Sequence, residues 1–162
     1  MKSLPLTVSL AVAFTAAVSA YASDASVDYP NGYRNWTHVK SLLLEPGHPL
    51  YEAFGGLHHI YANDRAMKGY RTGRFGDGAV IVFDLLEVGK SGNAIAEGPR
   101  KIVGVMQRDA RRFKETGGWG FEGFPKGDPK QRAVGKQAKA ACFACHAEQA
   151  AQTGFVFSAW RE

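Results

Sequence analysis

Residues 76–86 read Gly76-Asp77-Gly78-Ala79-Val80-Ile81-Val82-Phe83-Asp84-Leu85-Leu86, the most apolar strand-like stretch of the chain. The Gly-Asp-Gly sequence is typical of a tight turn, and the residues that follow Gly78 favour a strand. Successive side chains of a strand point to opposite faces, so one face of this strand would be entirely apolar. That face would carry Ala79, Ile81, Phe83 and Leu85. A loop containing Gly and Lys is predicted to follow, before a further strand at residues 101–107.

Three other segments also have the character of strands, and turn residues lie between them. They are residues 37–44, 57–62 and 119–124. Between the second and third, Asn63 or Asp64 can cap a short helix around residues 65–68, which a glycine at position 69 or 73 would end. These alternating runs argue against an all-helical fold.

The last part of the chain has the composition of a helix. Residues 128–131, Asp-Pro-Lys-Gln, place an N-cap Asp before a Pro at the first helical position. The alanine-rich run over residues 132–151 has high helix propensity, and Gly154 would end it. Residues 155–157, Phe-Val-Phe, are then predicted to pack back onto the body of the protein.

This predicted helix contains Cys142-Phe143-Ala144-Cys145-His146, a Cys-x-x-Cys-His sequence. Helical positions i, i+3 and i+4 share a face, so Cys142, Cys145 and His146 would point the same way. Two thioether bonds could then hold the edge of a haem while the His146 imidazole binds the iron as proximal ligand. The motif therefore predicts one covalently bound haem c, with His146 as the metal ligand.

Three other interpretations of the two cysteines compete with haem attachment: a thioredoxin-like redox pair, half of a zinc site, and a disulfide. The redox motif is expected near a βαβ unit, whereas this motif lies sixteen residues from the C-terminus. A zinc site needs more thiolates or a histidine pair at ligand spacing, and Cys142 and Cys145 are the only cysteines of the chain. Haem attachment is the favoured interpretation.

The beginning of the chain has the features of a secretory signal peptide. A positive start at Lys2 precedes the mostly apolar residues 4–18, and Ala20-Tyr21-Ala22 is a cleavage sequence. We therefore expect residues 1–22 to be removed and residues 23–162 to form a single haem domain, exported to a bacterial periplasm. No second apolar run approaches the ~18 residues of a membrane span.

The net charge of the full chain is +5, from 20 Lys and Arg against 15 Asp and Glu. This net positive charge could attract an acidic redox partner or an anionic surface, but a solvated basic face is the simpler interpretation. Lysines and arginines are scattered along the sequence rather than clustered, which argues against nucleic-acid binding.

The second axial position of the iron has no obvious ligand. An electron-transfer cytochrome often uses Met there, but the sixteen residues after His146 contain no Met, His or Lys. The upstream candidates are Met67, Met106, His38, His58 and His59. A lone Met on a strand more often fills a core, so we expect a five-coordinate iron with an open sixth position.

Several of these segments together resemble the cytochrome P-460 family. They are Tyr33-Arg34-x-Trp36, His58-His59-Ile60-Tyr61, Asp77-Gly78-Ala79-Val80-Ile81-Val82 and the late haem motif. The resemblance implies an α+β fold, mainly an antiparallel β-sheet with a few helices and the haem-bearing helix near the C-terminus. It also implies a homodimer.

The resemblance further implies roles for three residues. Hydroxylamine-oxidising members carry a lysine that crosslinks to the haem, and Phe83 stands at that position here. The branch without this lysine, cytochrome c′-beta, has two phenylalanines over the distal haem face, which by position are Phe54 and Phe83. His58 falls about where relatives carry a distal arginine, and His59 would point to the opposite face of the strand.

The favoured function is therefore binding of a small diatomic ligand, NO or CO, for scavenging, carriage or sensing, rather than catalysis. An apolar distal wall offers a bound ligand no hydrogen-bond donor, and NO and CO depend on one less than O₂ does. The alternatives are oxidation of hydroxylamine or NO, peroxidase-like turnover, and simple electron transfer. An all-helical cytochrome c′ bundle is the competing fold.

Overall fold

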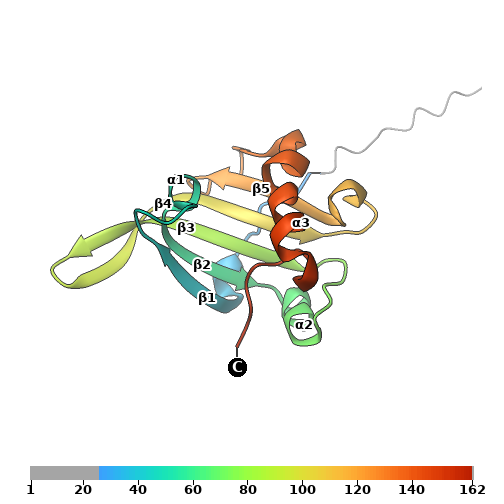
Figure 1. The fold of residues 1–162 in the computed structure, drawn as a ribbon, viewed down its shortest axis with the longest axis horizontal. Helices are drawn as coiled ribbons and strands as arrows, with labels where there is room; N and C mark the ends of the chain where they lie inside the picture. Colours follow the sequence, from blue (N-terminus) through green and yellow to red (C-terminus); the bar gives the residue numbers. More distant parts are fainter. Residues whose placement is uncertain (1–25, 162) are drawn as a thin grey trace, which may run out of the picture.

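The computed structural model describes residues 26–161, so the predicted signal peptide lies outside the described part of the chain. Its centre is one antiparallel sheet in which the strands are neighbours in sequence order (Figure 1). The strands are β1 (Thr37–Leu44), β2 (Gly56–Ala62), β3 (Val80–Ser91), β4 (Ala94–Arg108) and β5 (Trp119–Pro125). The α+β class with a mainly antiparallel sheet is thus confirmed, and the helical-bundle alternative is wrong.

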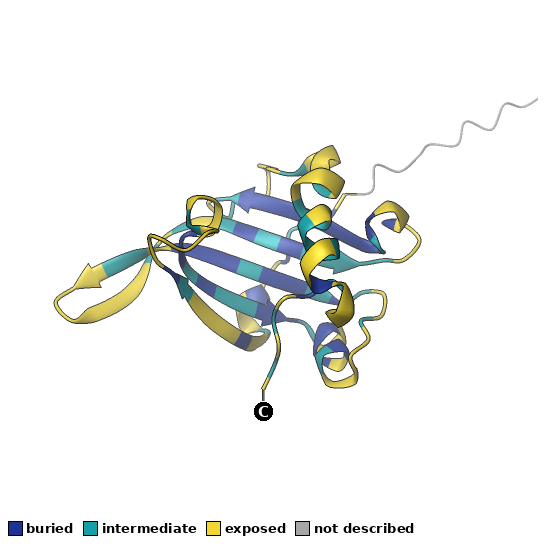
Figure 2. Cartoon of the chain, in the orientation of Figure 1, coloured by how far each residue is buried: buried dark blue, intermediate teal, exposed yellow. Residues whose placement is uncertain are grey.

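The segment predicted as a loop after residue 86 is instead a long hairpin. β3 continues to Ser91, β4 begins at Ala94, and Ser91 pairs with Ala94 across a turn in which Gly92 has a φ of +58°. The hairpin projects beyond the sheet and is largely exposed, as the yellow arm in Figure 2 shows. Because both of its faces meet solvent, its sequence lacks the apolar alternation that predicts a strand.

The helices are short and lie at the ends or over one face of the sheet (Figure 1). They are α1 (Tyr51–Phe54), α2 (Asp64–Thr72) and α3 (Ala144–Ala150). The prediction for α2 is confirmed: the Asn63 side chain accepts a 2.9 Å hydrogen bond from the Ala66 N–H, and Gly73 ends the helix at a φ of +72°. Among residues 26–161, no helix has both the length and the apolar character needed to cross a bilayer.

Single turns of tighter or wider helix complete the described chain. The 3₁₀ turns are η1 (Tyr33–Asn35), η2 (Lys114–Thr116), η3 (Gly135–Gln137) and η5 (Ala151–Thr153), and the π-helical turn is η4 (Lys139–Phe143). η4 runs directly into α3, and π-helical turns of this kind are frequent at functional sites.

The predicted helix start at Asp128 is wrong. Asp128 accepts the expected hydrogen bonds, from the Lys130 N–H and the Gln131 side chain, but they close only a turn. The buried carboxylate of Glu122 on β5 then accepts a 2.9 Å hydrogen bond from the Val134 N–H, and it forms an ion pair with Arg132 at 3.3 Å. These bonds hold residues 132–134 in a loop, so the helix begins only at residue 139.

The two faces of the sheet support two separate cores. The face toward α3 carries one cluster of buried residues: Val39, Ala62, Ala66, Met67, Ala79, Ile81, Trp119, Phe121 and Val156. The opposite face carries a second cluster: Val27, Tyr33, Tyr61, Val82, Val103, Val105, Phe113 and Phe124. The tail residues 155–157 run back along the first face, and buried Val156 confirms that the tail packs there.

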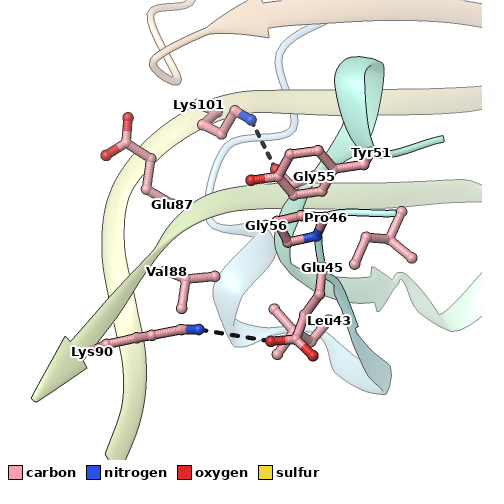
Figure 3. Close-up of a pocket in the computed structure, with 11 residues that line it drawn as sticks. Leu43, Glu45, Pro46, Tyr51, Gly55, Gly56, Glu87, Val88, Lys90 and Lys101 are labelled. Atoms are coloured by element: carbon pink, nitrogen blue, oxygen red, sulfur yellow. Dashed lines mark hydrogen bonds and ion pairs between the residues drawn. The ribbon is translucent and has the colours of Figure 1, made fainter. Parts of the chain in front are cut away.

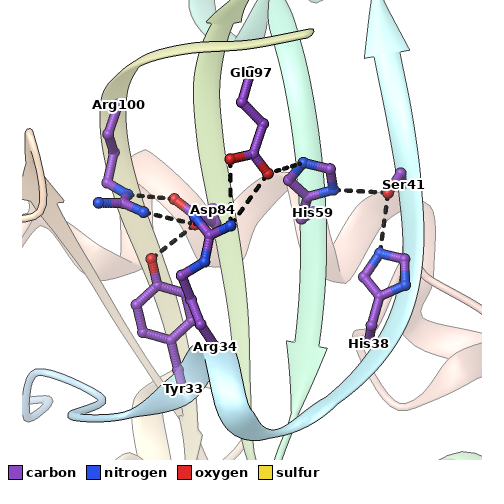
Figure 4. A network of polar contacts seen from close by, with 8 residues as sticks. All are labelled: Tyr33, Arg34, His38, Ser41, His59, Asp84, Glu97 and Arg100. Carbon is purple, nitrogen blue, oxygen red and sulfur yellow. Dashed lines mark hydrogen bonds and ion pairs between the residues drawn. The ribbon is translucent and has the colours of Figure 1, made fainter.

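The opposite face also holds a charged group at its centre (Figure 4). Asp84, on β3, is fully buried. Its carboxylate accepts a 2.8 Å bond from the Tyr33 hydroxyl and bonds of 2.6 and 3.1 Å from the Arg100 guanidinium. Burial and the adjacent carboxylate raise the pKa of Tyr33 above its ordinary value, which keeps this hydroxyl a donor.

From Asp84 the polar contacts continue to the surface. Arg34 lies 3.5 Å from Asp84 and 3.2 Å from Glu97, and Glu97 lies 3.0 Å from His59 Nε2 without the alignment of a hydrogen bond. The Ser41 hydroxyl then bridges His59 Nδ1 at 2.7 Å and His38 Nε2 at 3.0 Å. This network fixes the register of four strand and turn segments around β3.

We expect the two arginines beside Asp84 to differ in their contribution to stability. Arg100→Met would leave a buried carboxylate without its main cation, and the free energy of unfolding should fall by about 3 kcal/mol. Arg34→Met removes a half-exposed partner, and the loss should stay below about 1 kcal/mol. Urea denaturation of the two variants measures both values; equal losses would contradict a special role for Arg100.

Candidate functional site

The sheet face beneath α3 is made of rows of side chains that run across the strands. The first row is Ala62, Ile81, Met106 and Phe121; the second is Ile60, Phe83, Gly104 and Gly123; the third is His58, Leu85, Ile102 and Pro125. Neighbouring rows are two residues apart along each strand, which is about 7 Å. The row to which a residue belongs therefore gives its position along the strands on this face.

His146 lies over the first row. Its ring centroid is 5.0 Å from that of Phe121 and 4.6 Å from that of Phe157 in the C-terminal tail. The Nδ1–H donates a 2.7 Å hydrogen bond to the Phe155 carbonyl oxygen, which leaves the Nε2 lone pair free. Burial lowers the pKa of His146, which favours the neutral ring that a metal requires.

The two cysteines of the motif lie on neighbouring helical turns. Cys142 is in η4, Cys145 is in α3, and both are half-buried free thiols. Cys142 packs against the first-face core, and burial raises the pKa of its thiol. Within residues 26–161, no cluster of three or more His, Cys, Asp or Glu side chains could hold a metal ion. The free thiols are the form that thioether attachment requires.

The three other predicted site residues lie together, on the same face as His146. The Phe83 ring centroid is 5.9 Å from that of Phe54 and 4.6 Å from that of His58. Phe83 belongs to the second row and His58 to the third, so both lie farther toward α1 than the row beneath His146. His59 faces the opposite side, as the alternation predicts.

Phe54 sits on α1, and two hydrogen bonds fasten this short helix to the sheet. His58 Nε2–H donates to the Phe54 carbonyl at 2.5 Å, and Lys101 Nζ donates to the Gly55 carbonyl at 2.8 Å. Figure 3 shows the second bond at the wall of a hollow of about 300 Å³ between the β1–α1 segment and the base of the hairpin. The helix α1 thus forms part of the wall of this hollow, to which it contributes Tyr51.

Beside Phe83, two neighbouring positions of the face, one on β4 and one on β5, carry no side chain of their own. Gly104 pairs with Phe83, and Gly123 pairs with Gly104. A Cβ at position 104 would lie 3.2 Å from Phe83 Cδ1, and one at position 123 would lie 2.7 Å from Ile102 Cδ1. The two glycines therefore make room for the side chains of Phe83 and Ile102, which lie over them; we refer to Gly104 and Gly123 as the glycine floor.

Large apolar side chains around this floor are exposed. Leu42, Phe54 and Phe157 are 47%, 44% and 55% exposed, respectively. A flat apolar group placed on the glycine floor would cover such side chains, and the unprotonated His146 Nε2 would meet a metal at its centre. The residues present thus fit a haem held by Cys142, Cys145 and His146.

The structure also places the other candidate axial ligands. Met67 is buried in the first-face core, and Met106 packs against the same core beneath His146. His38 and His59 lie on the opposite face of the sheet. Of the three histidines, only His58 shares the face with Phe83, and burial lowers the pKa of its ring. Its Nε2–H is already committed to the Phe54 carbonyl, so Nδ1 is the remaining free position.

Sequence reasoning missed the residues that shape this site without side-chain chemistry. Phe155 acts through its backbone carbonyl, so any residue at that position could accept the bond from His146. Gly104 and Gly123 act through the absence of a side chain, and only the pairing of β3, β4 and β5 brings them beside Phe83. A glycine within each strand was the available signal.

Comparison with known proteins agrees with this geometry. No curated protein matches the chain. A family model described as Cytochrome P460 matches residues 30–158, a span that includes the whole sheet, Phe54, Phe83 and the Cys-x-x-Cys-His motif. The family is one of haem proteins and implies haem c with its iron. The chain therefore belongs to the cytochrome P460 family.

Proposed function

We propose that the protein is an exported haem c protein of the cytochrome c′-beta type, which binds NO or CO at a five-coordinate iron. The observation that carries the proposal is the Phe54–Phe83 ring pair, on the same sheet face as His146 and beyond the glycine floor. Phe83 stands where the resemblance expects a haem-crosslinking lysine, and a phenyl ring has no nucleophile for that bond. The proposal includes a homodimer.

The residues on the two sides of the floor would have different tasks. His146 Nε2 would hold the iron on one side, and the bond from Nδ1 to the Phe155 carbonyl fixes the ring and raises its basicity. Bound haem supplies the iron that takes up a diatomic ligand. Phe54 and Phe83 would shape the other side, exclude water and give the ligand no donor. NO and CO tolerate such a wall better than O₂ does.

The absorption spectrum of the reduced holoprotein tests this proposal. We expect a high-spin, five-coordinate spectrum that changes on addition of NO or CO, with the ordinary bands of haem c and no lysine-modified chromophore. A low-spin, six-coordinate spectrum before any ligand is added would refute the open site and favour an electron carrier.

A donor introduced at position 54 should change the ligand preference. We expect Phe54→Gln to raise the affinity for O₂ relative to CO by about tenfold, because one hydrogen bond contributes about 1 kcal/mol or more. Phe54→Leu is the matched control, since it keeps the wall apolar and should leave the ratio within about twofold. Ligand titrations of the reduced proteins give both ratios; an unchanged ratio in the Gln variant would place residue 54 away from the ligand.

Oxidation of hydroxylamine is the second candidate, and the position of His58 favours it. His58 is buried beside Phe83, and the lowered pKa keeps its ring neutral and able to accept a proton at Nδ1. Holoprotein incubated with hydroxylamine and an excess of a chemical oxidant tests this activity. Sustained turnover that His58→Asn abolishes would establish the enzyme, and no turnover would leave ligand binding as the function.

A further inference from the structure

The fold gathers cationic side chains that are scattered in the sequence. A groove of about 700 Å³ lies between the turn after β4, strand β5 and the loop that leads into η4, elements that can be followed in Figure 1. Six cationic side chains line it, against the two carboxylates of Glu115 and Glu122; the six are Arg111, Arg112, Lys114, Arg132, Lys136 and Lys139. Cationic residues that are scattered along the sequence are therefore close together on this part of the surface.

Two of the six cations are committed to the structure. Arg112 donates a 2.7 Å hydrogen bond to the Ser26 carbonyl, and Arg132 donates one of 2.7 Å to the Val27 carbonyl in addition to its ion pair with Glu122. The other four make no side-chain hydrogen bond or ion pair within the described part of the chain, and all four are exposed. They are Arg111, Lys114, Lys136 and Lys139. Their charge is thus available to a partner.

The groove has the anatomy of a protein-binding site rather than that of a small-anion site. Its floor includes buried apolar side chains, Val27, Phe113 and Phe121, while the free cations stand at its margins. An apolar centre with a charged rim is the usual arrangement of a transient protein interface. The size of the hollow also exceeds what a single phosphate or sulfate would fill.

The groove floor leads directly to the haem ligand. Phe121 lines the groove, and its ring packs against the His146 ring at 5.0 Å between centroids. Lys139 and Ala138, at the margin, stand at the start of the helical segment that carries Cys142. A protein seated in the groove would thus approach the iron from the His146 side, away from Phe54 and Phe83.

We propose that this groove is the docking surface for a small acidic electron-transfer protein. A second copy of this chain that docked through the same groove would bring the same free cations against one another, which disfavours a symmetric pair as the occupant. The proposal requires a haem on Cys142, Cys145 and His146, but it does not depend on which ligand the iron binds. Every test therefore uses holoprotein whose haem content has been verified.

Binding to plant-type ferredoxin, an acidic redox protein, provides the first test, with the ferredoxin oxidised so that no electron is transferred during the titration. We expect Lys136→Glu/Lys139→Glu to weaken binding at least tenfold at low salt in calorimetric titrations, and wild-type affinity to fall steeply as salt is raised. The matched control is Lys68→Glu/Lys126→Glu, which makes the same change of charge at exposed positions outside the groove. Its affinity should fall less than threefold. Equal losses in the two variants, or no dependence on salt, would refute the proposal.

Zero-length carbodiimide crosslinking provides a test that needs no variant. A wild-type complex crosslinked between lysines and ferredoxin carboxylates, then digested and analysed by mass spectrometry, should join through Lys114, Lys136 or Lys139. Crosslinks confined to lysines on other surfaces, such as Lys40 or Lys68, would overturn the assignment.

Electron transfer measured by stopped-flow mixing provides a further test. One electron should pass from the cluster of reduced ferredoxin, which becomes oxidised, to the ferric iron, which becomes reduced. The groove variant should slow this transfer at least tenfold, and an unchanged rate would also overturn the assignment.

Discussion

The alternation of side chains along β3 is the constraint on which the rest of the structure depends. Phe83 and Asp84 are neighbours in sequence, so they must point to opposite faces of the sheet. On one face, Phe83 meets Phe54 and His58; on the other, the fully buried Asp84 carboxylate is held by Tyr33 and Arg100. A buried charge tolerates little displacement, because each lost partner is costly. The ion pair behind the sheet therefore fixes the backbone that presents Phe83 in front of it.

A backbone carbonyl has a comparable role on the other side of the site. The short helix α3 carries His146, but the carbonyl that orients the imidazole belongs to Phe155, which follows the end of the η5 turn at Gly154. The tail is itself anchored, since Val156 is buried and the Trp119 indole N–H donates a 2.9 Å bond to the Gly154 carbonyl. The orientation of the proposed iron ligand thus depends on tail packing that lies outside the Cys-x-x-Cys-His motif.

The sequence predicted those parts of the fold in which local pattern and burial agree. The run at 79–86 is apolar almost throughout because β3 is buried on both faces, and the run at 37–44 has the period of a strand; both are strands. Residues 87–100 form a hairpin with two exposed faces, so no alternation reveals it. Asp128 and Pro129 satisfy the local rules for a helix start, but the distant carboxylate of Glu122 takes the Val134 N–H and delays the helix. Local pattern cannot report such a contact from another strand.

The same distinction applies to the site. Cys142, Cys145 and His146 belong to one continuous motif, so their predicted grouping needs no knowledge of the fold. Phe54 and Phe83 were predicted only through the family resemblance, because α1 and β3 are brought together by strand pairing. The cationic groove escaped prediction for a similar reason: its side chains come from two segments, residues 111–114 and 132–139, which meet only across β5.

The proposed haem site would therefore be reached from two sides, one cationic and the other apolar. Free cations and a ring in contact with His146 border one side, whereas exposed Phe54 and half-buried Phe83 border the other. A charged macromolecule is drawn to the first side by long-range attraction, which solvent and salt screen only partly at low ionic strength. An uncharged diatomic molecule feels no such field and partitions into the apolar side. Because the two approaches do not overlap, a docked partner on the His146 side would leave the Phe54–Phe83 side open to a ligand.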